Sequence, residues 1–501
     1  MNGHLLELTL AHLRLSLWAL MLGAMISLPL GVWAARHKAL ERVVLGVAGV
    51  VQTIPGLALL AAMVPALAAL STIGLEVPSI GALPAVLGLT LYSLLPILRN
   101  TVVGLSEVDP AAKRAARGVG MTPGQQLRWV ELPMAAPVIV AGLRTATVWT
   151  VGMATLATPV GAQSLGDLIF SGLQLRDHGS VLAGCAASAA LALSLDALIR
   201  LAESGARNRQ RSRWLPASGA LLLLCLWALT SPLLGLLEPT PAVRIGAKPF
   251  TEQHILAELL AEEVREVSGT EPDVLHSLGS SVAFDALVAG DLDVYVEYTG
   301  TVWTSSMGRD EMPEDRDALF DEVSDWLETE HGVVVLARLG FENAYALAVR
   351  SPANGGPAVA RIGQLSALAP GLTVAGDYEL FERGEWRSLT ETYGLHFAEQ
   401  RTMDPTLLYQ ALAAGEVDVI GAYTTDGRIA AFDLVVLEDE RGAIPPYDAI
   451  IIANGAFVGR QPEVAAAMRA LQNTIDDAAM REMNRAVDED GAEPGEVARR
   501  R

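Results

Sequence analysis

Apolar residues follow two different patterns along this chain. Up to about residue 240 they form long, nearly uncharged stretches, and after residue 242 they form short groups separated by amphipathic segments. A stretch of about 20 apolar residues can cross the hydrocarbon core of a bilayer. Short apolar strands that alternate with amphipathic helices are typical of α/β domains. The pattern therefore predicts an N-terminal all-α polytopic membrane domain and a C-terminal α/β domain.

Six membrane crossings are predicted in the first half. Five are simple apolar segments, although the fourth has to begin near Pro133 and the fifth has to extend to Ile199 to be long enough: Leu15–Ala35, Val77–Leu98, Thr145–Gly166, Gly179–Leu195 and Leu215–Leu237. The sixth, Val43–Leu75, is too long for one straight crossing and contains a Pro-Gly pair in "QTIPGLA". We predict a bend or a short re-entrant piece there.

The basic residues of this half predict its orientation. With six crossings, residues 35–42, 105–131 and 200–213, which carry most of its lysines and arginines, fall on one side. The positive-inside rule makes that side cytoplasmic, so the N-terminus and the C-terminal domain lie outside. A signal peptide is an alternative for the first segment, but its length and the apolar segments that follow favour a retained helix.

Charge differs sharply between the halves. Residues 1–240 contain 16 Lys and Arg against 11 Asp and Glu, a net charge of +5, and residues 241–501 contain 20 against 46, a net charge of −26. The acidic half contains no cysteine, and Cys185 and Cys225 lie in apolar runs where they act as small apolar residues. An acidic surface of this kind also fits adaptation to high salt.

Charged residues within the apolar segments are candidates for function. Arg144 lies well inside its predicted helix, and an intramembrane charge is either functional or a structural group that faces the bundle interior. Asp196 and Arg200 have the spacing of an ion pair on one helix face, which we interpret as architecture.

The loop from Glu107 to Pro133 predicts two short helices. Asp109 is the expected cap with Pro110 in the first turn, the Gly118/Gly120 pair ends the helix, and a second helix starts after Thr122-Pro123. Short amphipathic helices of this kind suit docking into a groove of a partner.

This loop resembles the coupling loop of ABC importer permeases. The family pattern is an acidic residue, two alanines, a glycine and a terminal Leu-Pro, and it is matched here by Ala115, Ala116, Gly120, Val130, Leu132 and Pro133. Arg114 replaces the usual glutamate. "QTIPGLALLA" and "LLPILRNT" resemble the quaternary-ammonium subfamily of these permeases. The resemblance implies a type I permease fold, a homodimer of the membrane domain and a separate cytoplasmic ATPase, and the chain itself contains no G-x-x-x-x-G-K-[ST] sequence.

The second half reads as strands alternating with helices, at a length that favours two lobes around a cleft. Parallel pairing is expected to predominate. The predicted strands are 243–247, 293–298, 333–340, 344–350, 372–376, 417–423, 433–439 and 449–454. The predicted boundaries are a permease domain over 1–214, a last crossing and linker over 215–240, a binding domain over 241–487 and a disordered tail over 488–501.

Two stretches of the acidic half have the same layout. Residues 285–300 and 410–427 each run from a helix end through a glycine and a strand to a tyrosine, a threonine and a turn. The carboxyl ends of strands in α/β sheets present groups that face ligands. Tyr298 and Tyr423 are therefore predicted to form opposing walls of one cleft, whereas Tyr295 is predicted to be core.

Most of the acidic half resembles the substrate-binding proteins for glycine betaine, carnitine and choline, which are periplasmic-binding-protein-like domains of type II. The matching segments include "IGAKPFTEQHILAELL", "YVEYTGT", "LGFENAYALAV" and "PPYDA". The resemblance implies a cage of tyrosines for a trimethylammonium group at Tyr298, Tyr345, Tyr423 and Tyr447. Thr301, Gln253, Asn343 and Arg383 are candidate donors to a ligand carboxylate, with Trp386 either covering the ligand or packing in the core.

Aromatic residues suit such a ligand because a quaternary ammonium has no N–H and is recognised by ring faces, each worth about 0.5–2 kcal/mol. Choline, which has no carboxylate, would not need the arginine, and ergothioneine remains an alternative ligand. A membrane-anchored receptor without transport is a second class of function. No catalytic, metal-binding, cofactor or nucleic-acid motif stands out, and six crossings argue against an enzyme on a simple anchor.

Overall fold

The computed structural model describes residues 2–71, 77–174, 178–208, 210–235, 243–309, 316–377, 380–382, 384–403 and 405–500. The chain folds as two compact units. The first contains residues 1–172 and 178–240, and the second contains residues 173–177 and 241–501. Each unit is described by itself.

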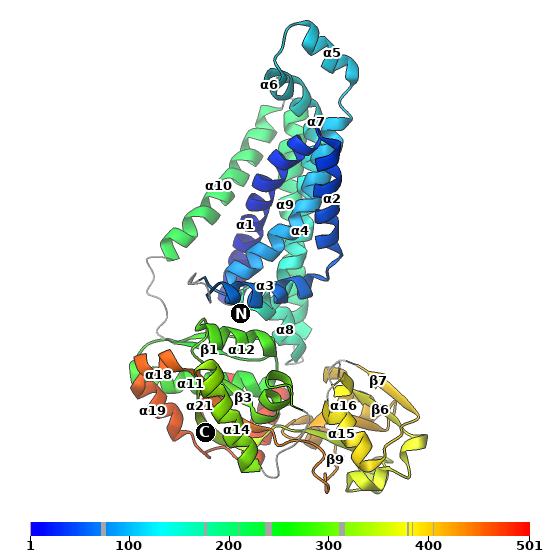
Figure 1. Cartoon of the computed structure of the whole chain (residues 1–501), viewed down its shortest axis with the longest axis vertical. Coiled ribbons are helices and arrows are strands. Elements are labelled where there is room, and N and C mark those ends of the chain that lie inside the picture. The colour runs from blue at the N-terminus through cyan, green and yellow to red at the C-terminus, as the bar shows by residue number, and fades with distance from the viewer. Residues whose placement is uncertain are drawn as a thin grey trace. The chain divides into compact units, whose positions relative to one another are not determined.

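The first unit is a bundle of helices (Figure 1). Its helices are α1 (Asn2–Ala34), α2 (Lys38–Thr53), α3 (Gly56–Ser71), α4 (Ala82–Ser106), α5 (Pro110–Gly118), α6 (Pro123–Gln126), α7 (Leu132–Ala154), α8 (Gly166–Gln174), α9 (His178–Arg207) and α10 (Arg211–Gly235). Among the described residues, five helices are long and apolar enough to cross a membrane, and a bent pair makes up to six. This confirms the predicted number of crossings.

The bent pair consists of α2 and α3, whose axes differ by 101°. The break falls on Ile54 and Pro55, as the Pro-Gly pair predicts, because a proline drives the preceding residue out of the helical region. Ile54 has an extended backbone with φ −70° and ψ 129°. The hydroxyl of Tyr92 on α4 donates to the Ile54 carbonyl. This backbone carbonyl, which loses its helical partner at the break, therefore still accepts a hydrogen bond.

Small residues bring α4 and α7 close together. A Cβ on Gly142 would lie 2.5 Å from the Cβ of Asn100 and 2.8 Å from the carbonyl oxygen of Pro96. Glycines at such crossings allow helix backbones to approach each other in a membrane.

Arg144 faces a carboxylate of a neighbouring helix. Its Nε and Nη2 donate to the two oxygens of Asp196 on α9 at 2.8 and 3.2 Å, and Nη1 lies 3.8 Å from Glu203. Asp196 also pairs with Arg200 at 3.4 Å, as the helical spacing predicts. The intramembrane arginine therefore joins α7 to α9 within the bundle.

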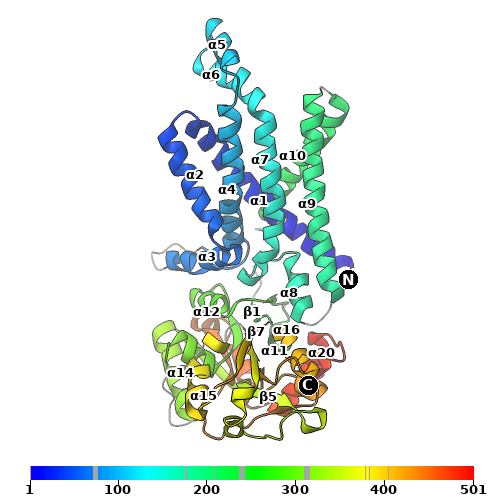
Figure 2. The ribbon, with the colours of Figure 1, turned by 90° about the vertical axis from the view of Figure 1, so that its right-hand side faces the viewer.

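The loop between α4 and α7 forms the predicted helix–turn–helix. Asp109 accepts from the Ala111 amide at 2.7 Å and caps α5, and Gly120 has a left-handed backbone with φ 83° after the helix. Thr122 caps α6, and a π-helical turn, Leu127–Glu131, leads into α7. Figures 1 and 2 show α5 and α6 at one end of the first unit and α3 at the other.

The second unit contains two five-stranded sheets, with strand orders β2-β1-β3-β10-β4 and β7-β6-β8-β5-β9. The strands are β1 (Arg244–Gly246), β2 (Asp273–Leu275), β3 (Val294–Tyr298), β4 (Val333–Glu342), β5 (Tyr345–Arg350), β6 (Thr373–Gly376), β7 (Glu399–Thr402), β8 (Val419–Tyr423), β9 (Leu434–Val436) and β10 (Asp448–Asn454). The eight predicted strands are present, whereas β2 and β7 were not predicted. Each sheet is the centre of one lobe.

Parallel pairing does not predominate, contrary to the prediction. Each sheet has two parallel and two antiparallel pairings. The antiparallel pairings all belong to β10 and β5, the strands that follow the passages of the chain from one lobe to the other. Each of these strands inserts between two strands of its new lobe.

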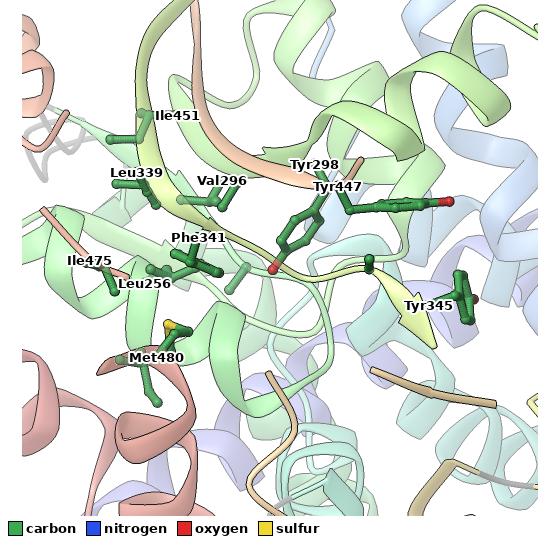
Figure 3. Packing of buried hydrophobic residues seen from close by; sticks show 14 of the residues in the cluster. Leu256, Val296, Tyr298, Leu339, Phe341, Tyr345, Tyr447, Ile451, Ile475 and Met480 are labelled. Carbon is green, nitrogen blue, oxygen red and sulfur yellow. The ribbon is translucent and has the colours of Figure 1, made fainter. Parts of the chain in front are cut away.

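Helices cover both sheets. The longer ones are α11 (Thr251–Ser268), α12 (Ser280–Ala289), α14 (Arg316–His331), α15 (Gly384–Tyr393), α16 (Pro405–Ala414), α19 (Pro462–Ala470) and α20 (Asp477–Asp488). Short helices are α13 (Thr299–Thr301), α17 (Arg428–Ala431), α18 (Gly455–Arg460) and α21 (Pro494–Arg499). Figure 3 shows part of the core of the first lobe, where Leu256, Leu339, Phe341 and Met480 meet.

The C-terminal tail is not disordered over the described residues, so that prediction is wrong. Residues 494–499 form α21, whose Val497 and Ala498 are buried in the same core as α11. The Gly, Pro and charged residues of this segment suggested disorder, but Glu493 and Pro494 start a helix and two apolar side chains suffice to dock it.

Candidate functional site: a tyrosine cluster between two sheets

Two passages of the chain join the lobes and lie against each other. The first is Asn343–Ala344 between β4 and β5, and the second leads from β9 to β10. The Asn343 amide donates to the Tyr447 carbonyl at 3.0 Å. Thr424 clamps the first passage, since its hydroxyl donates to the Glu342 carbonyl and accepts from the Ala344 amide, each at 3.0 Å. Tyrosines gather around this junction.

Three of the four predicted cage tyrosines make ring contacts with one another. Tyr345 begins β5 and pairs in register with Tyr423 at the end of β8. Their ring centroids are 4.9 Å apart, and the rings of Tyr345 and Tyr447 lie edge-on at 6.2 Å. Tyr447 packs over Gly300, where an added Cβ would lie 2.7 Å from the ring. The structure thus brings Tyr345, Tyr423 and Tyr447 together.

Tyr298 is the last residue of β3, and β3 pairs with β10, which begins at the residue after Tyr447 (Figure 3). It is 4% exposed, stacks with Phe250 at 6.3 Å and has the Lys248 ammonium 5.4 Å from its ring centroid. Tyr298 and Tyr423 therefore occupy equivalent strand ends in the two sheets. Tyr295 is fully buried in the core and donates to Glu297, as predicted for a core residue.

Carboxylates accept from the hydroxyls of all four tyrosines. Tyr298 donates to Glu252 at 2.5 Å, Tyr423 and Tyr345 donate to Asp377 at 2.7 and 3.3 Å, and Tyr447 donates to Glu385. All three carboxylates are buried: Glu252 on α11, Asp377 after β6 and Glu385 on α15.

Burial raises the pKa of the Glu252 carboxyl, and hydrogen bonds from Thr425, Tyr298 and the amides of Asn343 and Asn484 oppose that shift. The same burial raises the pKa of Tyr298 and Tyr423 well above the ordinary value for a phenol, with the adjacent carboxylates adding to it. Both phenols therefore stay protonated donors at any physiological pH.

The candidate donors for a ligand carboxylate are mostly engaged within the protein. Gln253 Nε2 donates to the Val296 carbonyl at 2.9 Å and to the Tyr298 hydroxyl at 3.1 Å. Asn343 Nδ2 donates to Glu252 at 2.9 Å. Thr301 is half-buried in α13, next to the end of β3. Arg383 lies outside the described residues.

Trp386 packs rather than covering the surface. It is 7% exposed, with Phe381 edge-on at 4.9 Å and Phe397 stacked at 5.9 Å. A small cavity beside it is lined by Tyr345, Ala346, Leu347, Leu380, Glu385, Trp386, Leu389 and Ile444. This cavity adjoins the tyrosine cluster on the side of the second lobe.

Sequence reasoning missed the three carboxylates and Lys248. Glu252 precedes Gln253, and Glu385 precedes Trp386, so each adjoins a residue that the sequence singled out. Asp377 follows strand β6, where an acidic residue at a strand end is itself a signal. Lys248 pairs with Glu297, and both side chains are 3% exposed.

In the loop between α4 and α7, the predicted coupling residues occupy the helix–turn–helix. Ala115 is exposed on α5, Ala116 is buried, Gly120 follows the helix, and Leu132 and Pro133 open α7. Arg114 is exposed on α5. Val119, which follows α5, and Trp129, in the π-helical turn, are 74% and 65% exposed.

Comparison with known proteins identifies the chain. The substrate-binding domain of ABC-type glycine betaine transport systems matches residues 241–500. The chain belongs to this family. Residues 27–208 match the inner membrane component of binding-protein-dependent transport systems. The protein is therefore a multi-pass membrane protein that fuses the permease and the substrate-binding component of an ABC transporter, and its second unit has the type II binding-protein fold.

Individual relatives are similar to one or both units of the chain. The chain is 29% identical over 475 residues to the ergothioneine transport permease/ergothioneine binding protein EgtU of Helicobacter pylori (strain G27), across 92% of this chain and 83% of that protein. It is 45% identical over 197 residues to the osmoprotectant import permease protein OsmW of Salmonella typhimurium (strain LT2), across 39% of this chain and 89% of that one. A crystal structure of a glycine betaine/carnitine/choline ABC transporter matches 52% of this chain and 96% of its own, with 28% identity and a TM-score of 0.47.

Proposed function

We propose that the tyrosine cluster is a cage for a trimethylammonium group and that the protein imports quaternary ammonium compounds such as glycine betaine, carnitine and choline. The observation that carries this proposal is the contact of Tyr345 with both Tyr423 and Tyr447 at the junction of the lobes. Each hydroxyl donates to a carboxylate within the protein, so the ring is the part of each tyrosine that remains to meet a ligand.

Ring faces suit this ligand because a trimethylammonium group cannot donate an N–H hydrogen bond. Each favourable cation–π contact contributes about 0.5–2 kcal/mol, depending on how far the charge is removed from water. Several tyrosines acting together select a large, weakly hydrated cation over a small ammonium ion.

Transport requires energy from a partner. The proposed partner is a separate cytoplasmic ATPase that docks on the helix–turn–helix of α5 and α6, and two copies of the membrane unit form the pathway. The basic residues of that loop favour a cytoplasmic position for it. The binding unit then lies outside the cell membrane, and closure of its lobes on a ligand signals occupancy to the permease.

Ergothioneine is a second candidate ligand, since it also carries a trimethylammonium group and a carboxylate. The similarity to a protein named for ergothioneine transport extends over 92% of the chain, through both units. A side-by-side titration with betaines and ergothioneine separates the two substrates.

The decisive experiment is calorimetric titration of the full-length chain in detergent with choline, glycine betaine, carnitine and ergothioneine. Tyr345→Ala removes the ring that contacts two others and is expected to weaken binding up to about 30-fold, the equivalent of about 2 kcal/mol. The control is Trp326→Ala. Trp326 stacks with Phe284 in the first lobe, whereas Tyr345 belongs to the second, so its loss should leave affinity unchanged.

Two results would overturn the proposal: no binding of any of these compounds by the wild type, or wild-type affinity in Tyr345→Ala. A transporter is distinguished from a sensor by hydrolysis. In proteoliposomes that also contain the partner ATPase, a ligand that binds should stimulate ATP hydrolysis, and its absence would favour the sensor.

A further inference from the structure

One feature recurs at every tyrosine of the proposed cage. The hydroxyl of each ring donates to a buried carboxylate, and the three carboxylates come from different elements: Glu252 from α11, Asp377 after β6 and Glu385 from α15. Asp377 serves two rings at once. Hydroxyls of buried tyrosines need a partner, but amide, carbonyl and hydroxyl groups satisfy them equally well.

Resting on the proposed function, we infer that Glu252, Asp377 and Glu385 are positioning residues that tune the four rings for a positively charged headgroup. Their effect has two parts. A hydrogen bond to an anion is shorter and stronger than one to a neutral acceptor, so it holds the ring plane firmly. A phenol that donates to an anion is also polarised, because hydrogen bonds in a low-dielectric interior polarise the groups they join.

Polarisation acts in the direction that a cage requires. Electron density moves from the O–H toward the ring, so the negative face that attracts a cation becomes more negative. The carboxylate charge adds direct attraction, which is stronger in a partly dry site than in water. Both effects favour a cation and leave a neutral molecule of the same shape almost unaffected.

Glu252 shows how firmly such a carboxylate is held. It is 2% exposed and accepts from Tyr298 and Thr425, each at 2.5 Å, and from the amides of Asn343 and Asn484 at 2.9 and 3.2 Å. Four donors fill the acceptor sites of an ionised carboxylate. One of them, Asn343, lies in the passage between the lobes, so Glu252 links a cage ring to that passage.

Amide substitution separates tuning from simple structural support. Glu252→Gln, Asp377→Asn and Glu385→Gln keep the size of each side chain and an oxygen that accepts from the phenol, but they remove the charge. Asp439→Asn is the matched control, because Asp439 accepts from Tyr393 at 2.5 Å and Tyr393 is outside the proposed cage.

The test compares choline with its neutral carbon isostere, in which a tert-butyl group replaces the trimethylammonium group. Choline and this isostere are titrated into the full-length chain in detergent. In each amide variant we expect the affinity for the charged ligand to fall about tenfold and the affinity for the isostere to change less than about twofold. The Asp439→Asn control should keep both affinities.

Equal weakening of both ligands in the variants would show that the carboxylates only support the structure, and unchanged affinity for the charged ligand would show that they do not act on the cage. Either result overturns the inference while the proposed function stands. Binding of no quaternary ammonium compound by the wild type overturns both. If Glu252→Gln fails to fold, as judged by its thermal unfolding midpoint, Asp377→Asn and Glu385→Gln decide the question.

Discussion

Arg144 of the membrane unit and Glu252 of the binding unit are accommodated in different ways. In the membrane unit, Arg144 of α7 meets a carboxylate of the opposite charge, Asp196 of α9, through two hydrogen bonds. In the binding unit, Glu252 of α11 is surrounded by neutral donors, two hydroxyls and two amides. In the first arrangement an opposite charge compensates the ion, and in the second the hydrogen bonds oppose the rise in the pKa of Glu252 that burial causes.

The difference fits the place of Arg144 in the membrane unit and the proposed role of Glu252. An uncompensated charge within a bilayer is costly, so a helix bundle neutralises it and gains a fixed helix–helix contact. A binding site for a cation benefits from negative charge that remains uncancelled nearby. Donor groups around a buried carboxylate lower the cost of keeping it charged. The following predictions test this contrast, from the largest expected effect to the smallest.

Removing one partner of the membrane ion pair should have the largest effect. Arg144→Leu leaves the partly buried Asp196 with Arg200 as its remaining basic partner, which is expected to destabilise the membrane unit by about 3 kcal/mol. The measurement is the thermal unfolding midpoint of the full-length chain in detergent.

The double variant Arg144→Leu with Asp196→Leu is the control for that prediction. It removes both charges, so most of the lost stability should return. A double variant as unstable as the single one would mean that the pair contributes more than charge cancellation.

Deleting one donor of Glu252 should cost less. Thr425→Val removes a hydroxyl that is 1% exposed and lies 2.5 Å from the carboxylate, and a hydrogen bond to a charged group contributes about 1.5–3 kcal/mol. The lost stability is measured by chemical denaturation, with hydrogen exchange of the α11 amides as the readout. Thr390→Val, which removes a hydroxyl bonded only to carbonyls of its own helix, should change stability by less than about 0.5 kcal/mol.

A buried histidine of the binding unit predicts a dependence on pH. Burial and the neighbouring His276 lower the pKa of His254 to about 3. Its ring nitrogen Nε2 has no hydrogen-bond partner among the described residues. The unfolded chain takes up a proton near pH 6.5 and the folded protein does not, so stability is lost as the pH falls from about 6.5 toward 3.

Substitution isolates this contribution. Between pH 7 and pH 5, His254→Gln should lose about 1–2 kcal/mol less stability than the wild type, measured by the same α11 exchange at both pH values. His396→Gln, at an exposed position, should follow the wild type. Identical slopes for His254→Gln and wild type would show that this ring is protonated in the folded protein.

The smallest effect is expected in the loop that connects α4 to α7. Asp109→Ala removes the cap of α5, which contributes about 1 kcal/mol. Hydrogen exchange of peptides from residues 110–118 should become about fivefold faster, while peptides of α9 stay unchanged. Unchanged exchange in α5 would mean that tertiary contacts alone hold the helix.

Much of the fold could be predicted because it depends on local pattern. The length of apolar runs predicted the membrane helices, Pro55 predicted the sharp bend between α2 and α3, and Asp109 with Pro110 predicted the start of α5. The errors concern pairing between distant segments. The direction of β5 and β10 depends on which strands they insert between, and the docking of α21 depends on α11.

The residues of the proposed site also divide into those that local pattern predicted and those that it did not. Recurrence at strand ends singled out Tyr298 and Tyr423, and motif resemblance added Tyr345 and Tyr447. The carboxylates that accept from these rings were missed, because no local pattern shows which tyrosine each of them meets. Glu252 and Thr425 are 173 residues apart in the chain, and Glu385 and Tyr447 are 62 residues apart.

The sequence by itself determined that this protein has a membrane unit and an acidic binding unit, where its helices bend and end, and which tyrosines stand at strand ends. Those properties follow from periodicity, capping and hydrophobic length, which act over a few residues. Only the tertiary structure decided that Arg144 meets Asp196, that three of the tyrosines touch, and that each hydroxyl finds a carboxylate. Such contacts depend on the packing of distant elements, because a hydrogen bond or ring contact requires positions to agree within about an ångström.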